Sequence, residues 1–319
     1  MPAPILISTN EAAFLAPRYG SMPKRAPISV VIPAYNAEKF IQQAIESVHA
    51  QTLAVTELIV VADDCSDETE SLAEALGATV IKVRARNISA ARNAGVRAAT
   101  QKWIAFLDAD DFWKADKIEC QWKAIERFPE AAVVSCDFYI IYDGATLPPS
   151  DEALCLRRDS IARPVIITKE GTYFSKVDGR VLRWFEIGPQ TVMIRRDVFE
   201  TAGWFDEQLV YLQDIEYFAR ALRDHSLVMI EKPLVYRRLR PDSHSANTEE
   251  KWSAYFSIVD RMLRCPDQYA PLAGEQYREH LKFVFAANER AFAEKRQREA
   301  ASRSSAQPPA SNPDGRVSE

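Results

Sequence analysis

The chain has 319 residues, and 47% of them are hydrophobic, which is enough to fill a substantial core. This composition excludes collagen-like, coiled-coil and wholly disordered proteins. With 40 basic against 45 acidic residues the net charge is −5, so the composition indicates no nucleic-acid partner, and any anionic ligand must be held locally.

Cysteine content and hydropathy bear on the compartment. The five cysteines are odd in number and include no Cys-x-x-Cys pair, which favours a reducing compartment over a disulfide framework or a zinc site. Residues 1–7 lack the features of a signal peptide, and no apolar run approaches the roughly 18 residues of a membrane-spanning helix. We therefore expect a cytoplasmic protein that could still touch the inner face of the membrane.

Four short apolar runs recur in the first third of the chain, and segments with helical spacing separate them. The runs cover residues 28–32, 58–62, 79–83 and 103–107. Such runs are typical of strands buried on both faces of a parallel sheet. Helix starts are expected at Asn36, Asp67 and Asp116. This β-α-β-α order predicts an α/β fold with a doubly wound, mainly parallel central sheet.

The second half of the chain lacks this strict alternation. Strand patterns cover residues 133–142, 164–168, 190–194 and 227–230. We expect them to form a mixed, partly antiparallel extension of the same sheet. Helical stripes over residues 252–263 and 277–292 predict C-terminal helices after that extension.

Polar residues follow each of the first four predicted strands, where ligands bind in open parallel sheets. A single Asp after a strand commonly caps the next helix, which suffices for Asp67 and Asp116. Capping does not explain six acids at two strand ends, within residues 63–67 and 108–111, because clustered carboxylates repel one another unless a cation or hydrogen-bond donors neutralise them. We therefore expect a bound cation.

The kind of cation follows from what the sequence lacks. Counting from Asp108, the fifth position is Phe112, which excludes an EF-hand calcium loop. Magnesium or manganese held by few protein oxygens completes its shell with water and phosphate, so a diphosphate ligand is expected. Neither a Gly-x-Gly-x-x-Gly nor a Walker loop is present, so side chains would help to hold it. Arg92 is either such a donor or a solvated residue.

Six short strings occur in a characteristic order along the chain. They are residues 30–36 (VVIPAYN), 63–67 (DDCSD), 91–95 (ARNAG), 107–111 (LDADD), 203–207 (GWFDE) and 213–216 (QDIE). Together they resemble the family 2 glycosyltransferases with the GT-A fold, over about residues 28–245. The resemblance implies inverting transfer of a sugar from a nucleotide diphosphate donor, usually a UDP-sugar, to a hydroxyl acceptor in cell-surface glycan or polysaccharide synthesis.

The resemblance also implies roles on the donor side, position by position. Pro33 and Tyr35 would line the base pocket, and Asp64 would hydrogen-bond the base. Asp108 would lie by the ribose or the metal shell. Asp110 of the Asp-x-Asp motif would bind the magnesium or manganese ion, which would stabilise the leaving diphosphate.

On the acceptor side, the resemblance makes Asp214 the base that takes the proton of the attacking hydroxyl. The alternative is a helix cap only, since a helix N-terminus would depress the pKa of Asp214 and weaken it as a base. Trp184, Glu186 and Gln213 would shape the acceptor pocket, although packing in the core is the alternative for the aromatic side chain. His244 would reach the diphosphate or the metal, or would be a solvated loop residue.

Two positions depart from the family pattern. Cys65 stands where the family often has Gly, and Gln213 replaces the usual Glu before the base. The expected organisation is an irregular extension (1–27), a nucleotide-sugar-binding half (28–112), an acceptor-binding half of the same domain (113–245), C-terminal helices (246–299) and a disordered tail (300–319).

Competing functions remain open at this point. One alternative is a sugar nucleotidyltransferase. Such enzymes resemble one another in having a glycine-rich loop after the first strand, and the absence of glycine from residues 33–37 counts against this alternative. A non-catalytic glycosyltransferase-like binding subunit is the other alternative. The basic end of the C-terminal stripe would suit peripheral membrane contact or simply be solvated, and a homo-oligomer is compatible with the sequence.

Overall fold

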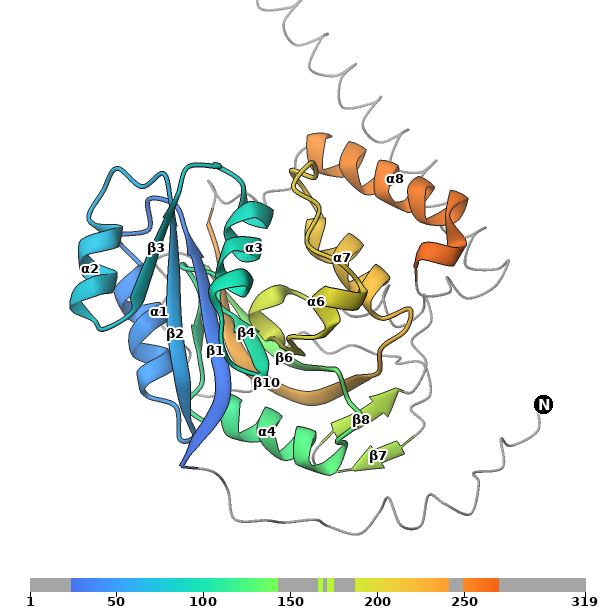
Figure 1. The fold of residues 1–319 in the computed structure, drawn as a ribbon, viewed down its shortest axis with the longest axis horizontal. Helices are drawn as coiled ribbons and strands as arrows, with labels where there is room; N and C mark the ends of the chain where they lie inside the picture. Colours follow the sequence, from blue (N-terminus) through green and yellow to red (C-terminus); the bar gives the residue numbers. More distant parts are fainter. Residues whose placement is uncertain (1–23, 143–165, 169–170, 175–186, 241–248, 270–319) are drawn as a thin grey trace, which may run out of the picture. The chain divides into compact units, whose positions relative to one another are not determined.

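One mixed sheet organises the part of the chain that the structure describes. The computed structural model describes residues 24–142, 166–168, 171–174, 187–240 and 249–269 (Figure 1). The chain divides into two compact units, residues 1–272 and 273–319, and every described residue lies in the first. The sheet order is β3-β2-β1-β4-β9-β6-β10-β8-β7, with β5 paired to β10.

The four predicted parallel strands are confirmed. They are β1 (Arg25–Ala34), β2 (Ala54–Asp63), β3 (Thr79–Val83) and β4 (Trp103–Phe106). Val31 of β1 lies opposite Ile59 of β2 and Phe106 of β4. β1 begins at Arg25, before the predicted start at Ile28, because an irregularity at Pro27 lets the strand pair with β2 on both sides of it.

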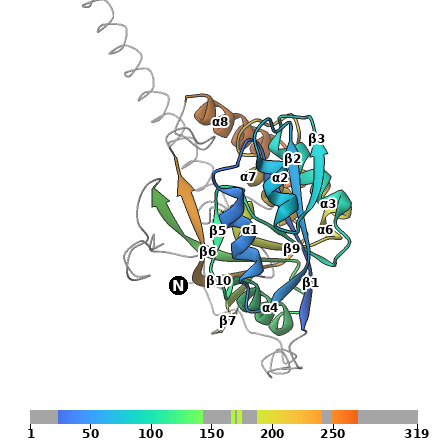
Figure 2. The same cartoon turned by 90° about the vertical axis from the view of Figure 1, so that its left-hand side faces the viewer.

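Helices cover both faces of the sheet, as predicted (Figures 1 and 2). One face carries α1 (Ile41–His49), α2 (Thr69–Ala75) and α4 (Lys117–Arg127), and the other carries α3 (Ile88–Ala98), α6 (Val198–Thr201) and α7 (Gln213–Ala221). The alternation of side chains along β1 separates the two cores, because Val30 packs in the first and Val31 in the second.

One of the three expected helix starts, at Asn36, is wrong. Asn36 lies five positions before α1, at a φ of 45°, and its side chain accepts a hydrogen bond from the backbone N–H of Ser66. Asp116 occupies the position directly before α4, so that helix starts where expected, although the Asp116 carboxylate binds the Lys232 ammonium and does not cap the helix. Asp67 accepts the N–H of Thr69 and therefore supports the start of α2.

The mixed extension of the sheet is also confirmed. Its strands are β5 (Phe112–Trp113), β6 (Val133–Tyr142), β7 (Ile166–Thr168), β8 (Gly171–Phe174), β9 (Val192–Arg195) and β10 (Leu227–Leu239). β9 is antiparallel to both β4 and β6, and β10 is parallel to β6. β10 continues past the predicted end at Ile230, because pairing with β6 resumes at Val235 after an irregularity at Pro233.

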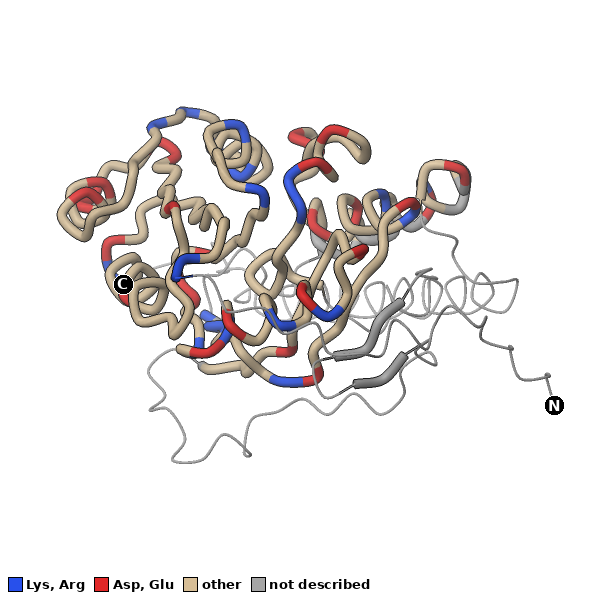
Figure 3. The backbone as a smooth tube through the Cα atoms, turned by 60° about the horizontal axis from the view of Figure 1, so that its bottom comes forward, with Lys and Arg blue, Asp and Glu red and all other residues tan. Residues whose placement is uncertain are grey.

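The remaining described elements follow β10. They are α8 (Glu249–Arg264) and the 3-10 helix η3 (Pro266–Gln268); another, η2 (Pro189–Thr191), precedes β9. α8 contains the predicted stripe over residues 252–263, and its Ile258 and Met262 pack with Ala219 of α7. No described helix is both long and apolar enough to cross a membrane. Acidic and basic residues are both scattered along the described backbone (Figure 3).

Candidate active site

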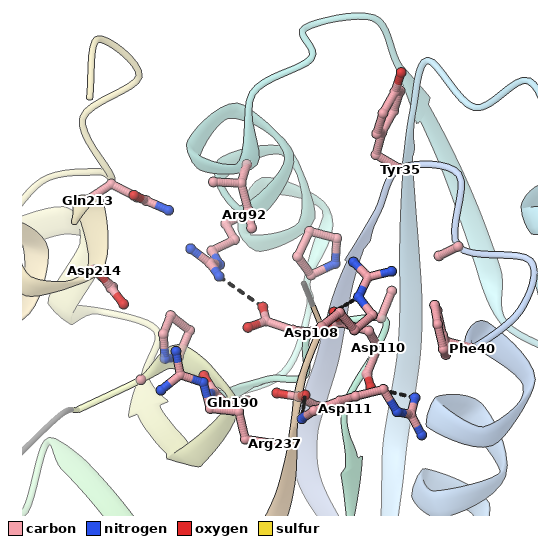
Figure 4. A pocket seen from close by; sticks show the side chains of 18 of the residues that line it. Tyr35, Phe40, Arg92, Asp108, Asp110, Asp111, Gln190, Gln213, Asp214 and Arg237 are labelled. Atoms are coloured by element: carbon pink, nitrogen blue, oxygen red, sulfur yellow. Dashed lines mark hydrogen bonds and ion pairs between the residues drawn. The ribbon is translucent and has the colours of Figure 1, made fainter. Parts of the chain in front are cut away.

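A cavity of about 380 Å³ opens beyond the carboxyl ends of β1 and β4, where the sequence predicted a ligand site. Its walls come from the loop after β1, the start of α3, the loop after β4, the η2 segment, the start of α7 and the end of β10. Figure 4 shows Tyr35 and Phe40 on one side of this cavity and Gln213 and Asp214 on the other. Segments distant in sequence therefore supply one site.

The loop after β4 places three carboxylates at the cavity. The side chain of Asp108 accepts a hydrogen bond from Arg92, with 2.9 Å between Oδ1 and Nη2, and Asp110 forms an ion pair with Arg240. Asp111 is buried and accepts the backbone N–H of Arg238 at 2.8 Å. Burial raises the pKa of Asp110 and, more strongly, that of Asp111, and repulsion among the three carboxylates adds to both shifts.

Arg92 is a buried donor rather than a solvated residue. It lies on α3 with 2% of its surface exposed, and its guanidinium lies 5.6 Å from the ring centroid of Phe205. One terminal nitrogen binds Asp108, whereas Nε and Nη1 have no hydrogen-bond partner among the described residues. A buried guanidinium with unsatisfied donors at a cavity wall is suited to an anionic ligand.

Asp214 lies in the first turn of α7, where the sequence placed it. Leu212, two residues before Asp214, has a left-handed φ of 58° and is the residue from which the helix starts. Oδ1 of Asp214 accepts a hydrogen bond from the backbone N–H of Ile215 at 2.9 Å. Burial raises the pKa of Asp214, and the nearby Arg92 partly opposes this shift. The expectation that the helix N-terminus depresses this pKa is therefore wrong, because desolvation of the carboxylate outweighs it.

The loop after β2 divides into structural acids and one acid near the cavity. Asp63 is buried and accepts three backbone N–H groups, those of Ala85, Arg86 and Asn87, so it needs no cation. Asp64 binds Arg86 at 2.7 Å, and the Arg86 guanidinium lies 5.8 Å from the ring centroid of Tyr35. Asp64 does not line the cavity itself but is connected to its Tyr35 wall.

The acid cluster inferred from sequence is thus smaller than expected, because backbone donors satisfy Asp63 and Asp67. The described residues contain no group of three or more His, Cys, Asp and Glu side chains arranged to hold a metal. Asp108 and Asp110 still offer paired, mutually repelling carboxylates at the cavity. Such a pair fits a magnesium or manganese ion that takes its other ligands from water and phosphate.

Other predicted site residues have mixed outcomes. Pro33 and Gln213 line the cavity, and Gln213 is buried beside Asp214. Trp184, Glu186 and His244 lie outside the described residues. The sequence analysis missed three arginines that line the cavity at the end of β10 and just after it, Arg237, Arg238 and Arg240. The available signal was a run of arginines at the end of an apolar strand pattern.

Comparisons with known proteins identify the family of the chain. A model of the family described as glycosyl transferase family 2 matches residues 29–202. The Escherichia coli protein named UDP-Glc:alpha-D-GlcNAc-diphosphoundecaprenol beta-1,3-glucosyltransferase WfgD is 41% identical over 245 residues, covering 75% of this chain and 87% of that protein.

Two solved structures are similar in fold. Residues 1–349 of Staphylococcus aureus TarS in complex with UDP-GlcNAc match with a TM-score of 0.57 and 20% identity, over 74% of this chain and 66% of that one. The mannosyltransferase PcManGT from Pyrobaculum calidifontis in complex with GDP-Man and Mn²⁺ matches with a TM-score of 0.53 and 14% identity, over 78% of this chain and 66% of that one.

The family match covers more than half of the chain, and the similarity to the Escherichia coli relative covers three quarters of it. The mixed α/β fold of the described unit matches that of these glycosyltransferase structures. The chain belongs to the family 2 glycosyltransferases and is a glycosyltransferase of GT-A fold.

Proposed function

We propose that this chain transfers a sugar from a UDP-sugar to a hydroxyl of a growing glycan, with inversion at the anomeric carbon. The observation that carries the proposal is the placement of Asp214 across one cavity from Asp108 and Asp110, with the unsatisfied donors of Arg92 at the wall (Figure 4). A divalent cation bound at Asp110 would neutralise the charge that develops on the leaving diphosphate.

The roles of the protein groups follow from their surroundings. Arg92 donates to the diphosphate through Nε and Nη1 while its bond to Asp108 fixes its orientation. Asp214 accepts the proton of the attacking hydroxyl, and its raised pKa makes it a stronger base than an exposed Asp. One base suffices, because an activated donor does not need its leaving oxygen protonated.

The donor and acceptor classes rest on the comparisons. The name of the Escherichia coli relative gives a UDP-glucose donor and a diphosphoundecaprenol-linked GlcNAc acceptor, and the TarS structure holds UDP-GlcNAc. These similarities support a UDP-sugar donor and a lipid-linked glycan acceptor in polysaccharide synthesis. Such an acceptor would bring a cytoplasmic enzyme to the inner face of the membrane.

The test measures binding and turnover separately on the full chain. Calorimetry with UDP and a panel of UDP-sugars, with and without Mn²⁺, reports binding, and sugar transfer to a lipid-linked GlcNAc acceptor reports turnover. Asp110→Ala is expected to lose the Mn²⁺-dependent part of UDP binding. Asp214→Asn is expected to bind UDP as the wild type does and to lose about 10²- to 10⁴-fold in turnover.

A matched control is Asp197→Asn, because Asp197 forms an exposed ion pair with Arg195 far from the cavity lining. This variant is expected to bind and turn over normally. Near wild-type transfer by Asp214→Asn would refute the base assignment. Sugar nucleotide binding by the wild type without either transfer or donor hydrolysis would favour the binding-subunit alternative.

A further inference from the structure

The end of β10 sets two arginines against the acid loop in different ways. Arg238 is anchored: its Nη1 donates to the backbone carbonyl of Asp110 and its Nη2 to the side chain of Gln43, both at 2.8 Å. Its own N–H binds Asp111. Arg238 therefore holds the loop that carries Asp110 in place, and we assign it a structural role in the site.

Arg240 instead contacts the carboxylate of Asp110 itself. The distance from Arg240 Nε to Asp110 Oδ2 is 3.3 Å, longer than the 2.9 Å of the ion pair between Arg92 and Asp108. The side chains of Arg240 and Asp110 are 24% and 26% exposed, so both are reached from the cavity. The guanidinium also lies 4.9 Å from the ring centroid of Phe40, a face that holds a cation without fixing its hydrogen bonds.

In its proposed role, the Asp110 carboxylate would therefore interact with two positive groups, the Arg240 guanidinium and the divalent ion. A guanidinium that neutralises this carboxylate lowers its attraction for a divalent ion, and two positive groups on one carboxylate repel each other. A diphosphate changes this balance, because it offers Arg240 a second set of oxygens that matches the guanidinium bidentately. The cation at Asp110 and the position of Arg240 are therefore linked.

We propose that Arg240 is a resident counter-cation of Asp110, which Asp110 exchanges for the divalent ion when the nucleotide enters. The released guanidinium then pairs with the diphosphate. This inference rests on the proposed function and adds to it that the free enzyme binds the metal weakly and that metal and nucleotide bind cooperatively. By linkage, the metal strengthens nucleotide binding by the same factor by which the nucleotide strengthens metal binding.

The experiment counts bound Mn²⁺ by electron paramagnetic resonance, with and without UDP, and measures UDP binding by calorimetry. Arg240→Gln is expected to bind Mn²⁺ alone about fivefold or more tightly than the wild type, and to show a correspondingly smaller effect of UDP on Mn²⁺ affinity. Arg240→Lys keeps the charge but not the planar donor set, so it is expected to retain weak binding of Mn²⁺ alone and to lose UDP affinity.

The matched control is Arg195→Gln, which removes an arginine that also pairs with an Asp through Nε, at the opposite end of β4 from the acid loop. It is expected to change neither affinity. Unchanged binding of Mn²⁺ alone by Arg240→Gln, with intact UDP binding in the wild type, would overturn the counter-cation role and leave the proposed function standing. A wild type that binds no UDP in the presence of Mn²⁺ would overturn both.

Discussion

The two halves of the sheet hold their parts of the cavity by different means. In the first half, parallel strands end together and close apolar packing fixes α3 against them: a Cβ added at Gly95 would lie 2.3 Å from a methyl group of Val31. In the second half, a buried ion pair joins Glu216 and Arg220 on α7, the helix that carries Asp214. Both helices pack through apolar side chains, and α7 has in addition a buried ion pair between two of its own residues.

The buried pair also ties α7 to its surroundings. Glu216 has no exposed surface and accepts hydrogen bonds from Arg220 and from the hydroxyl of Tyr269, beyond α8. Arg220 donates further to the backbone carbonyls of Ala202 and Trp204. The start of α7 is therefore positioned through a polar network that joins three segments, whereas the partly buried ion pair on α3, between Arg92 and Asp108, joins that helix to the loop after β4 alone.

The largest expected stability loss comes from breaking this network. Glu216→Gln leaves the partly buried Arg220 guanidinium without its counter-charge, and we expect the free energy of unfolding to fall by about 3 kcal/mol in urea titrations. Glu119→Gln is the matched control, because Glu119 forms a partly exposed i,i+4 pair with Lys123 on α4. The control is expected to change stability by about 0.5 kcal/mol or less. Equal losses in the two variants would contradict the comparison.

The apolar half is tested by adding one methyl group. Gly95→Ala is expected to lower the free energy of unfolding by about 2 kcal/mol, because overpacking against β1 outweighs the gain in helix propensity. Val31→Ala in the same chain removes the obstructing methyl groups, so the double variant should lose less than the sum of the two single variants. Strict additivity would mean that α3 is free to shift away from β1.

A smaller effect, of opposite sign, is expected at Asp214. Burial raises its pKa above the ordinary 3.8, so the folded protein holds the Asp214 proton more tightly than the unfolded chain does. Wild-type stability therefore falls as the pH rises from 3.8 through the raised pKa. Asp214→Asn should therefore be more stable than the wild type at pH 7, because it has no buried charge to desolvate.

That gain should disappear below pH 3.8, where the wild-type carboxyl is protonated in both states. Urea unfolding of the wild type and Asp214→Asn, from below pH 3.8 up to pH 7, measures this stability difference. Asp197→Asn, at an exposed carboxylate, is the control. A stability difference between Asp214→Asn and the wild type that does not vary with pH would show that the side chain acts through packing rather than through its charge.

The same contrast explains which features could be predicted from sequence. The parallel strands and the acids of residues 108–111 follow from local apolar runs and from the rule that strand ends meet at one edge. The β10 arginines were missed, because Glu231-Lys232-Pro233 interrupts the strand pattern, and only long-range pairing with β6 carries the strand past it. The acids of residues 63–67 were overinterpreted, since backbone N–H donors from distant loops cannot be counted from sequence.

The smallest expected effect separates the charge of the network from its hydrogen bonds. Tyr269→Phe removes the hydroxyl that donates to Glu216 at 3.1 Å but leaves the ion pair with Arg220 intact. Because Glu216 keeps a charged partner, we expect a loss of only about 0.5 kcal/mol in the free energy of unfolding. Combining Tyr269→Phe with Glu216→Gln should then add almost nothing to the larger effect. An additional loss as large as that of Glu216→Gln itself would mean that Tyr269 supports α7 through its buried ring, and that packing positions α7 as it positions α3.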